Sequence, residues 1–322
     1  EKEYTFDEMI DYKEGDRGFK VKAEDTYGYI TISTLPVTYK TIPGPSLTLT
    51  ESTIFAGTDA KKGVPVQIES VRGVHEVVIY RIENGSEVEA LRETKNGEHT
   101  LNYAPEIDFT EATSKLKVVV SDGREGKEAI GYMKAYVNMD VATLNVGSQP
   151  LANNAHVKYP DAFGMVSLND LKTYSVDYAI ANEVNAKNVD FKFYCFGASG
   201  SPRLYSMDNT GKDGEFSGST GKLSAIKVKN LTRFAILSNF DYENATVASI
   251  SSEILSSSIA QSLLDPIAVG NVIAFRTGGS SAAGGGRIGV MKVINITEPK
   301  ELVSNNATAR VMTVEIKFPK KK

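Results

Sequence analysis

Two glycine-containing stretches of the chain could bind phosphate groups. GSTGKL at 218–223 contains a Gly-Lys pair, but a phosphate loop also needs an earlier glycine and a hydroxyl residue after the lysine. Phe216 occupies the position of that glycine and Leu223 follows the lysine, so the pattern favours a polar hairpin turn. RTGGSSAAGGGRIG at 276–289 lies between two predicted strands, whereas a dinucleotide loop leads from a strand into a helix. This stretch therefore favours a hairpin loop, in which Arg287 is the natural donor to any ligand.

The candidate metal ligands and catalytic groups lack partners at a useful spacing. DNTGKDGE at 208–215 gathers acidic residues and glycines, but a lysine occupies one of the alternating positions that would have to supply oxygen to calcium. None of the three histidines, His75, His99 and His156, has a partner at a spacing typical of a metal site or of a base paired with a nucleophile. The single cysteine, Cys195, shares a strand face with Phe191 and Phe193, which predicts a buried structural thiol. We predict no metal, no cofactor and no catalytic residue, although a carboxylate pair for glycoside hydrolysis is set by the fold and stays open.

Tyrosines are the main candidates for ligand contact. Sugar sites usually stack an aromatic ring on the apolar face of a pyranose, and the chain has 15 tyrosines but no tryptophan. Tyr159 in KYPDAF and Tyr205 in SPRLYSMDN lie in loop-like stretches, and Arg203 makes the second loop the stronger candidate. With Arg287 they are the predicted ligand-binding residues. Most tyrosines of strand-rich proteins are half-buried strand residues, and that interpretation also stays open.

Composition limits the classes of partner. The chain has 322 residues, of which 41% are hydrophobic and 24% charged, as in globular proteins. Its formal net charge of −4 argues against nucleic acid, which needs a basic face. The terminal FPKKK reads as a solvated tail, and no apolar run is long enough to span a membrane. Because the sequence lacks an initiator methionine and begins in the middle of a pattern, we expect a trimmed mature fragment.

An internal repeat explains the beginning of the chain. IDYKEGDRGFKVKAED at 10–25 aligns without gaps with IDFTEATSKLKVVVSD at 107–122, an offset of 107 − 10 = 97 residues. Six pairs are identical: Ile10/Ile107, Asp11/Asp108, Glu14/Glu111, Lys20/Lys117, Val21/Val118 and Asp25/Asp122. Each segment leads through a turn into a return strand, so both read as a terminal β-hairpin. A period of this length has the size of an immunoglobulin-like sandwich.

The repeat divides the N-terminal part of the chain. Residues 44–140 are predicted to be a complete immunoglobulin-like domain, and residues 1–43 the C-terminal remnant of a preceding copy. The Pro-Gly-Pro of TIPGPS at 41–46 is the linker. We therefore expect an N-terminal hairpin with few partners and an exposed edge. GVHEVVIYRIENG, which starts at Gly73, resembles a strand of bacterial immunoglobulin-like domains, and this resemblance implies a fold and not a function.

The C-terminal part, 141–322, has a different pattern of residues. Runs such as VDFKFYCF, NVIAFRT and GRIGVMKVINI read as strands, and NATVASISSEILSSSIAQSLL at 244–264 is the best helix candidate. We predict a larger, mainly-β sandwich with one or two short helices that carries the binding function. The run LKTYSVDYAIANEVNAKNVDFKFYCFGASGSPRLYS and the closing TVEIKF are similar to surface lipoproteins of gut Bacteroidetes. That resemblance implies a lipid-anchored outer-membrane protein, some of whose relatives bind glycans; the anchoring cysteine is not in this sequence.

The sequence thus predicts an all-β, multi-domain protein whose immunoglobulin-like units are spacers. The expected activity is non-catalytic binding or adhesion at the cell surface, with a glycan or a host or matrix component as partner and the protein itself a monomer. Two alternatives stay open. One is a glycan-active hydrolase with its carboxylates on the last sandwich, and the other is a structural subunit of a surface assembly, joined by strand addition.

Overall fold

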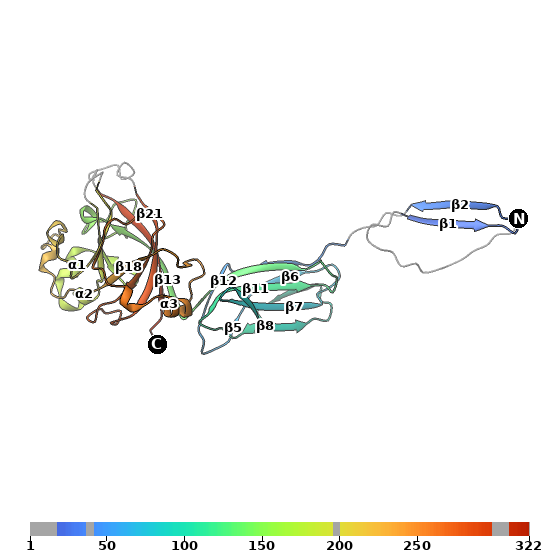
Figure 1. Cartoon of the computed structure of the whole chain (residues 1–322), viewed down its shortest axis with the longest axis horizontal. Helices are drawn as coiled ribbons and strands as arrows, with labels where there is room; N and C mark the ends of the chain where they lie inside the picture. Colours follow the sequence, from blue (N-terminus) through green and yellow to red (C-terminus); the bar gives the residue numbers. More distant parts are fainter. Residues whose placement is uncertain (1–17, 37–41, 196–199, 298–308, 322) are drawn as a thin grey trace.

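The chain folds as an extended series of β-structures. The computed structural model describes residues 18–36, 42–195, 200–297 and 309–321. Figure 1 shows a two-stranded hairpin at the N-terminal end, a first β-sandwich in the middle and a larger β-sandwich at the C-terminal end. The predicted all-β class, built from sandwiches with short helices, is confirmed.

The N-terminal hairpin consists of β1 (Gly18–Glu24) and β2 (Ile30–Pro36), which form a two-stranded antiparallel sheet of their own. The Asp25 carboxylate fixes the turn by accepting two main-chain hydrogen bonds of 2.9 Å each. All seven residues of β2 are exposed, including Ile32 at 52% and Leu35 at 61%. The hairpin therefore has strand pairing without a buried face.

The first sandwich packs a five-stranded sheet against a three-stranded one. The larger sheet has the order β4 (Thr53–Ala56), β12 (Ala129–Val137), β11 (Thr113–Ser121), β7 (Glu76–Glu83), β8 (Ser86–Thr94). The smaller has the order β3 (Ser46–Leu49), β6 (Val66–Glu69), β9 (Thr100–Tyr103), and a separate pair joins β5 (Lys62–Gly63) to β10 (Glu106–Ile107). Alternate residues of β11, namely Leu116, Val118 and Val120, are fully buried between the sheets. This alternation is the period of two expected for a strand with one buried face.

The turn between β11 and β12 holds the chain that enters this sandwich. Arg124 pairs with Asp122 at 2.6 Å and donates to the main-chain oxygens of Ile42 and Pro43, each at 3.0 Å. The Asp122 side chain is fully buried, and its hydrogen bonds from Arg124 lower the pKa of the carboxyl. One buried ion pair thus fixes the linker to the end of the sandwich.

The C-terminal sandwich has two five-stranded sheets. The first has the order β13 (Met139–Gly147), β22 (Val311–Pro319), β21 (Ile288–Ile296), β20 (Val272–Arg276), β18 (Arg233–Leu237). The second has the order β15 (Lys172–Tyr174), β14 (Met165–Ser167), β16 (Phe191–Tyr194), β17 (Arg203–Ser206), β19 (Leu263–Leu264). Side chains of both sheets form one core, to which Phe191, Phe193 and Leu204 contribute from one side and Val146, Met291 and Val314 from the other.

The described residues contain three short α-helices, where the sequence predicted one or two. α1 (Val176–Ala181) and α2 (Glu183–Lys187) belong to the part of the chain next to the second sheet, and α3 (Val247–Glu253) packs beside the first sheet. The helix predicted over 244–264 is wrong beyond Glu253. Thr246 starts α3 with a reciprocal capping box, but the serines that follow have poor helix propensity and a short turn of 3₁₀ helix replaces the helix.

The two sandwiches are joined through a single residue. Asn138 separates β12 from β13 and adopts a left-handed conformation with φ of 50°, which asparagine tolerates. Its side-chain amide donates to Thr58 at 3.0 Å and to Glu111 at 3.1 Å. Glu111 in turn accepts a main-chain hydrogen bond from Ala248 at the start of α3. The junction is therefore bonded to both sandwiches.

Charged groups extend this junction. Glu243 of the C-terminal sandwich lies between Lys134 of β12 (3.3 Å) and Lys292 of β21 (2.8 Å), and these contacts lower its pKa to about 2. The ammonium group of Lys317 is buried between the rings of Tyr136 and Tyr242 and donates to the Tyr242 main-chain oxygen at 2.6 Å. Burial lowers the pKa of Lys317 to about 8. These contacts pair groups from both sandwiches, so the two units are packed and not merely tethered.

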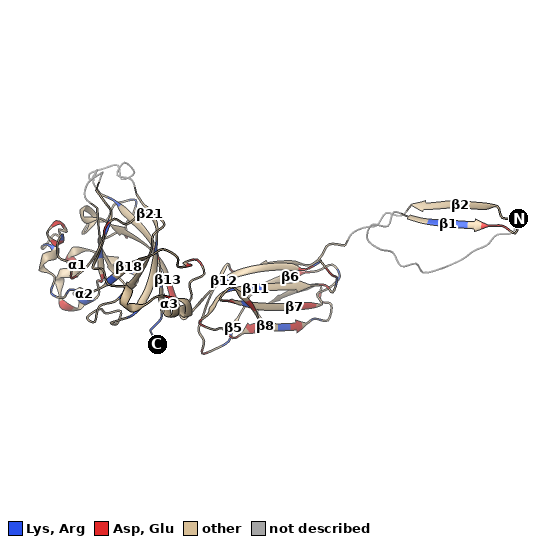
Figure 2. Ribbon diagram, in the orientation of Figure 1, with Lys and Arg blue, Asp and Glu red and all other residues tan. Residues whose placement is uncertain are grey.

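The surface carries charges of both signs. Figure 2 shows lysine and arginine interspersed with aspartate and glutamate along the chain. Within the ranges that the structure describes, no helix is both long and apolar enough to cross a membrane.

Candidate binding groove

The strand β18 lies at the edge of the first C-terminal sheet and leaves part of its outer side open. Its inner side pairs with β20 over all five residues. On the outer side, the main chain of Phe234 exchanges two hydrogen bonds with Gln261, at 2.8 and 3.1 Å. Because main-chain groups of an antiparallel strand alternate between its two edges, the N–H and C=O of Ile236 also point outward. None of the described residues hydrogen bonds to those groups of Ile236, or to the main chain of Ser238.

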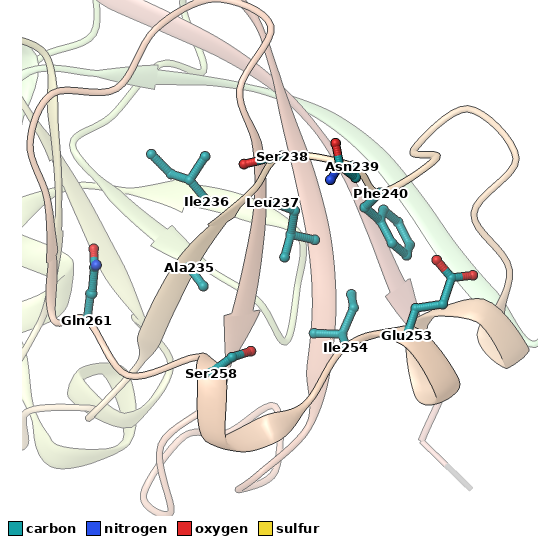
Figure 3. Close-up of a pocket in the computed structure, with 10 residues that line it drawn as sticks. All are labelled: Ala235, Ile236, Leu237, Ser238, Asn239, Phe240, Glu253, Ile254, Ser258 and Gln261. Carbon is teal, nitrogen blue, oxygen red and sulfur yellow. The ribbon is translucent and has the colours of Figure 1, made fainter.

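A groove of about 550 Å³ runs along this open edge. Figure 3 shows the groove between β18 with the loop that follows it, up to Phe240, and the segment that leads from the end of α3 to Gln261. Leu237, Phe240 and Ile254 give it an apolar floor, which is continuous with the core under α3.

Polar groups line the rim of the groove. Its lining contains five polar side chains, namely Ser238, Asn239, Glu253, Ser258 and Gln261. Glu253 is the one charged residue of the lining, and its carboxylate is exposed. The groove thus combines an apolar floor, an acidic rim and open main-chain donors and acceptors.

The segment from α3 to Gln261, which forms one wall of the groove, is fixed to the sheet. Val247 and Ile250 of α3 are buried against the first sheet, together with Ile254. Arg276 of β20 donates to the hydroxyl of Ser256 at 3.1 Å, and it also reaches the main-chain oxygen of Ile259 at 3.4 Å. The wall is therefore held from both ends, and the groove is a preformed feature of the fold.

The predicted ligand-binding residues lie outside the groove lining, and of the four the structure brings only Arg203 and Tyr205 together. Arg203 and Tyr205 share β17, but Tyr205 is only 5% exposed and packs edge-on against Tyr194. Arg203 forms an ion pair with Asp265 at 2.9 Å. The Tyr205 ring is therefore part of the core, and the Arg203 guanidinium is tied to a neighbouring loop.

The other two predicted residues also have structural contacts. Tyr159 packs against a small cluster that includes Leu151 and Val311. Arg287 donates to the main-chain oxygens of Ala283 (2.6 Å) and Pro319, and its guanidinium lies 4.0 Å from the centre of the Phe318 ring. Arg287 therefore fastens the glycine-rich loop to the last strand.

The acidic stretch at 208–215 consists of paired carboxylates. Asp208 pairs with Arg233 at 2.8 Å, and Glu215 pairs with Lys212 at 2.8 Å. Asp213 pairs with the fully buried Lys192 at 2.7 Å, and burial lowers the pKa of this lysine. The described residues contain no group of three or more candidate ligands that could hold a metal ion.

The sequence reasoning missed the groove although it identified both of its walls. RFAILS was predicted to be a strand, and the segment after Asn244 to contain a helix. The run of serines that ends α3 could have indicated an irregular segment beside that strand. What no local pattern reveals is that β18 lies at an edge of its sheet, because strand order depends on contacts between distant segments.

No protein-family model matches the chain, and no curated protein sequence matches it either.

Proposed function

We propose that the protein is a non-catalytic binding or adhesion protein that contacts its partner through the groove along β18. The observation that carries this proposal is the preformed groove beside an open strand edge, with apolar and polar lining in one place. Binding sites generally combine an apolar floor with a few polar groups that fix orientation. The lining contains a single carboxylate, Glu253, whereas glycoside hydrolysis requires two.

The remaining units serve this activity as spacers. The first sandwich, which we interpret as immunoglobulin-like, and the hairpin before it extend away from the C-terminal sandwich in Figure 1. The hydrogen bond from Ala248 of α3 to Glu111 and the ion pair of Glu243 with Lys134 hold the C-terminal sandwich against the first sandwich. We propose display at the cell surface by a lipid anchor outside this sequence, with a glycan or a host or matrix component as partner.

Array binding with a pair of groove variants tests the proposal. The whole chain is applied to arrays of glycans and of extracellular matrix proteins, alongside Ser258→Arg, which places a long side chain in the groove. Ser252→Arg is the matched control, because Ser252 is exposed on α3 outside the groove lining. We expect at least one ligand whose binding Ser258→Arg weakens by about tenfold or more, while Ser252→Arg keeps it. Silence on both arrays, or binding that Ser258→Arg leaves unchanged, would refute the proposal.

A structural subunit of a surface assembly is the second candidate. The observation in its favour is the hairpin, whose Ile30, Ile32 and Leu35 are more than half exposed. Apolar strands with free edges are templates for pairing between chains. Light scattering at increasing protein concentration tests this candidate: an assembly subunit grows into multimers, whereas the proposed binding protein stays monomeric.

A further inference from the structure

The outer edge of β18 has main-chain groups with which a further strand could pair. Gln261 already occupies one position of a neighbouring strand, at Phe234. The next outward-facing groups belong to Ile236 and have no partner among the described residues, and the main chain of Ser238, in the bend that follows β18, has none either. An extended polypeptide supplies the same groups at the same repeat, whereas a sugar does not.

The size and the lining of the groove also fit a strand. The end of β18, from Ala235 to Leu237, and the bend of Ser238 to Phe240 that follows it line one side of the groove, which leaves room for a short segment of about four or five extended residues. In an added strand, alternate side chains would face Leu237 and Ile254 on the apolar floor. The one aromatic ring of the lining, Phe240, is partly buried and packed on the core under α3. Stacking of a sugar on an exposed ring is therefore the less favoured use of this site.

The charge of the rim indicates which residues the partner contains. Glu253 is the one charged residue of the lining, and no lysine or arginine lies among the lining residues to balance it. The nearby Arg276 is engaged by Ser256 and Ile259. A lysine or arginine in the partner would gain a charge-assisted contact at this rim.

From these observations we infer that the partner is an extended polypeptide segment that adds as a strand to the free edge of β18. Its apolar side chains alternate with polar ones, and a lysine or arginine lies near Glu253. The inference rests on the proposed function, because it names the kind of molecule that the groove binds.

A pair of substitutions at one position isolates the main-chain contact. Ile236→Pro removes the outward N–H without touching the pairing with β20, and proline is tolerated where an edge strand faces solvent. Ile236→Thr is the matched control, because threonine keeps the N–H and suits a strand. The probe is a fluorescent library of peptides of about nine residues, in which apolar residues alternate with Lys, Thr or Ser. Binding to the whole chain is measured by fluorescence anisotropy.

We expect library members that bind the unaltered chain and Ile236→Thr with affinities within about threefold, and Ile236→Pro about tenfold or more weakly. The selected peptide is then N-methylated at every second residue, in two versions whose methylated positions differ by one residue. One version should lose binding because its methyl groups replace the N–H groups that pair with β18, and the other should keep it. If Ile236→Pro lowers the melting temperature, Ser238→Pro with Ser238→Ala replaces the pair.

Two outcomes would overturn the inference: no peptide that binds the unaltered chain above the proline variants, or binding that both N-methylated registers keep equally. If the arrays at the same time yield a glycan whose binding Ser258→Arg weakens, the proposed function is supported and the inference of a polypeptide partner is contradicted. If neither peptides nor array ligands bind, both fall.

Discussion

The hairpin β1–β2 and the hairpin β11–β12 have related sequences but opposite environments. Phe19 pairs with Leu35 in the first, and Leu116 pairs with Met133 in the second. The partners are 35 − 19 = 16 and 133 − 116 = 17 residues apart, so equivalent positions of the two hairpins keep nearly the same spacing. Yet Met133 is 1% exposed, whereas its counterpart Leu35 is 61% exposed. Strand pairing alone thus buries little, and the stability of a sandwich depends on the sheet that covers the apolar face.

Hydrogen exchange should show the largest contrast between the two hairpins. Amides of β1 and β2 are expected to exchange orders of magnitude faster than those of β11 and β12, since an isolated two-stranded sheet opens easily. Exchange followed by mass spectrometry on the whole chain measures both hairpins together. Comparable protection in both would mean that the N-terminal hairpin is covered in solution.

Truncation at equivalent positions of the two hairpins should lower the free energy of unfolding far more in the second hairpin than in the first. Val118→Ala truncates a fully buried side chain and is expected to lower the free energy of unfolding of the first sandwich by about 1–3 kcal/mol. Val21→Ala in the other hairpin, where Val21 is 39% exposed, should change it by less than about 0.5 kcal/mol. Urea denaturation measures both variants, and a large effect of Val21→Ala would contradict the comparison.

Substitution of the aspartates at the two turns should give a smaller difference in the free energy of unfolding, and this difference depends on pH. Asp122→Asn weakens the buried pair with Arg124 and should cost about 1–3 kcal/mol at neutral pH. Asp25 occupies the equivalent position on an exposed turn, so Asp25→Asn should cost less than about 1 kcal/mol.

The pH dependence follows from the lowered pKa of Asp122. A carboxyl whose pKa is lower in the folded state stabilises the fold above its unfolded pKa of about 4 and loses this contribution as pH falls through the folded value. The difference between the unaltered chain and Asp122→Asn should therefore shrink as the pH drops below about 4. A difference that stays constant over that range in thermal melts would argue against the ion pair.

The exposed ion pair of the first hairpin should have the smallest effect. Lys22 and Glu24 lie 2.9 Å apart, but both side chains are about half exposed. Pairs of this kind contribute about 0–1 kcal/mol, so Lys22→Ala should leave the melting temperature of the chain unchanged. A measurable drop would show that β1 has a partner in solution.

How far the sequence predicts this molecule depends on the range of the interactions involved. Alternating patterns located strands such as β21 and β22, because a strand with one buried face shows its period locally. The pattern was insufficient for Tyr205, which was predicted to lie in a loop but pairs with Lys192 of β16 and lies in the core.

Long-range pairing accounts for the features that were missed. The ion pair of Lys192 with Asp213 joins residues 21 positions apart and buries a lysine that local hydrophobicity would place at the surface. The groove likewise depends on the strand order that leaves β18 at an edge. Such features follow from the assembled sheet and have no signature in a short stretch of sequence.

The single-residue junction at Asn138 has a mechanical consequence. Tension applied along the molecule passes from β12 to β13 through one residue, with no slack linker to extend first. The force would act along β12, whose parallel pairing with β4 would be loaded in shear, so that several hydrogen bonds must break together. The connection between the two sandwiches should therefore resist pulling as a stiff element, while the lone β1–β2 hairpin yields first.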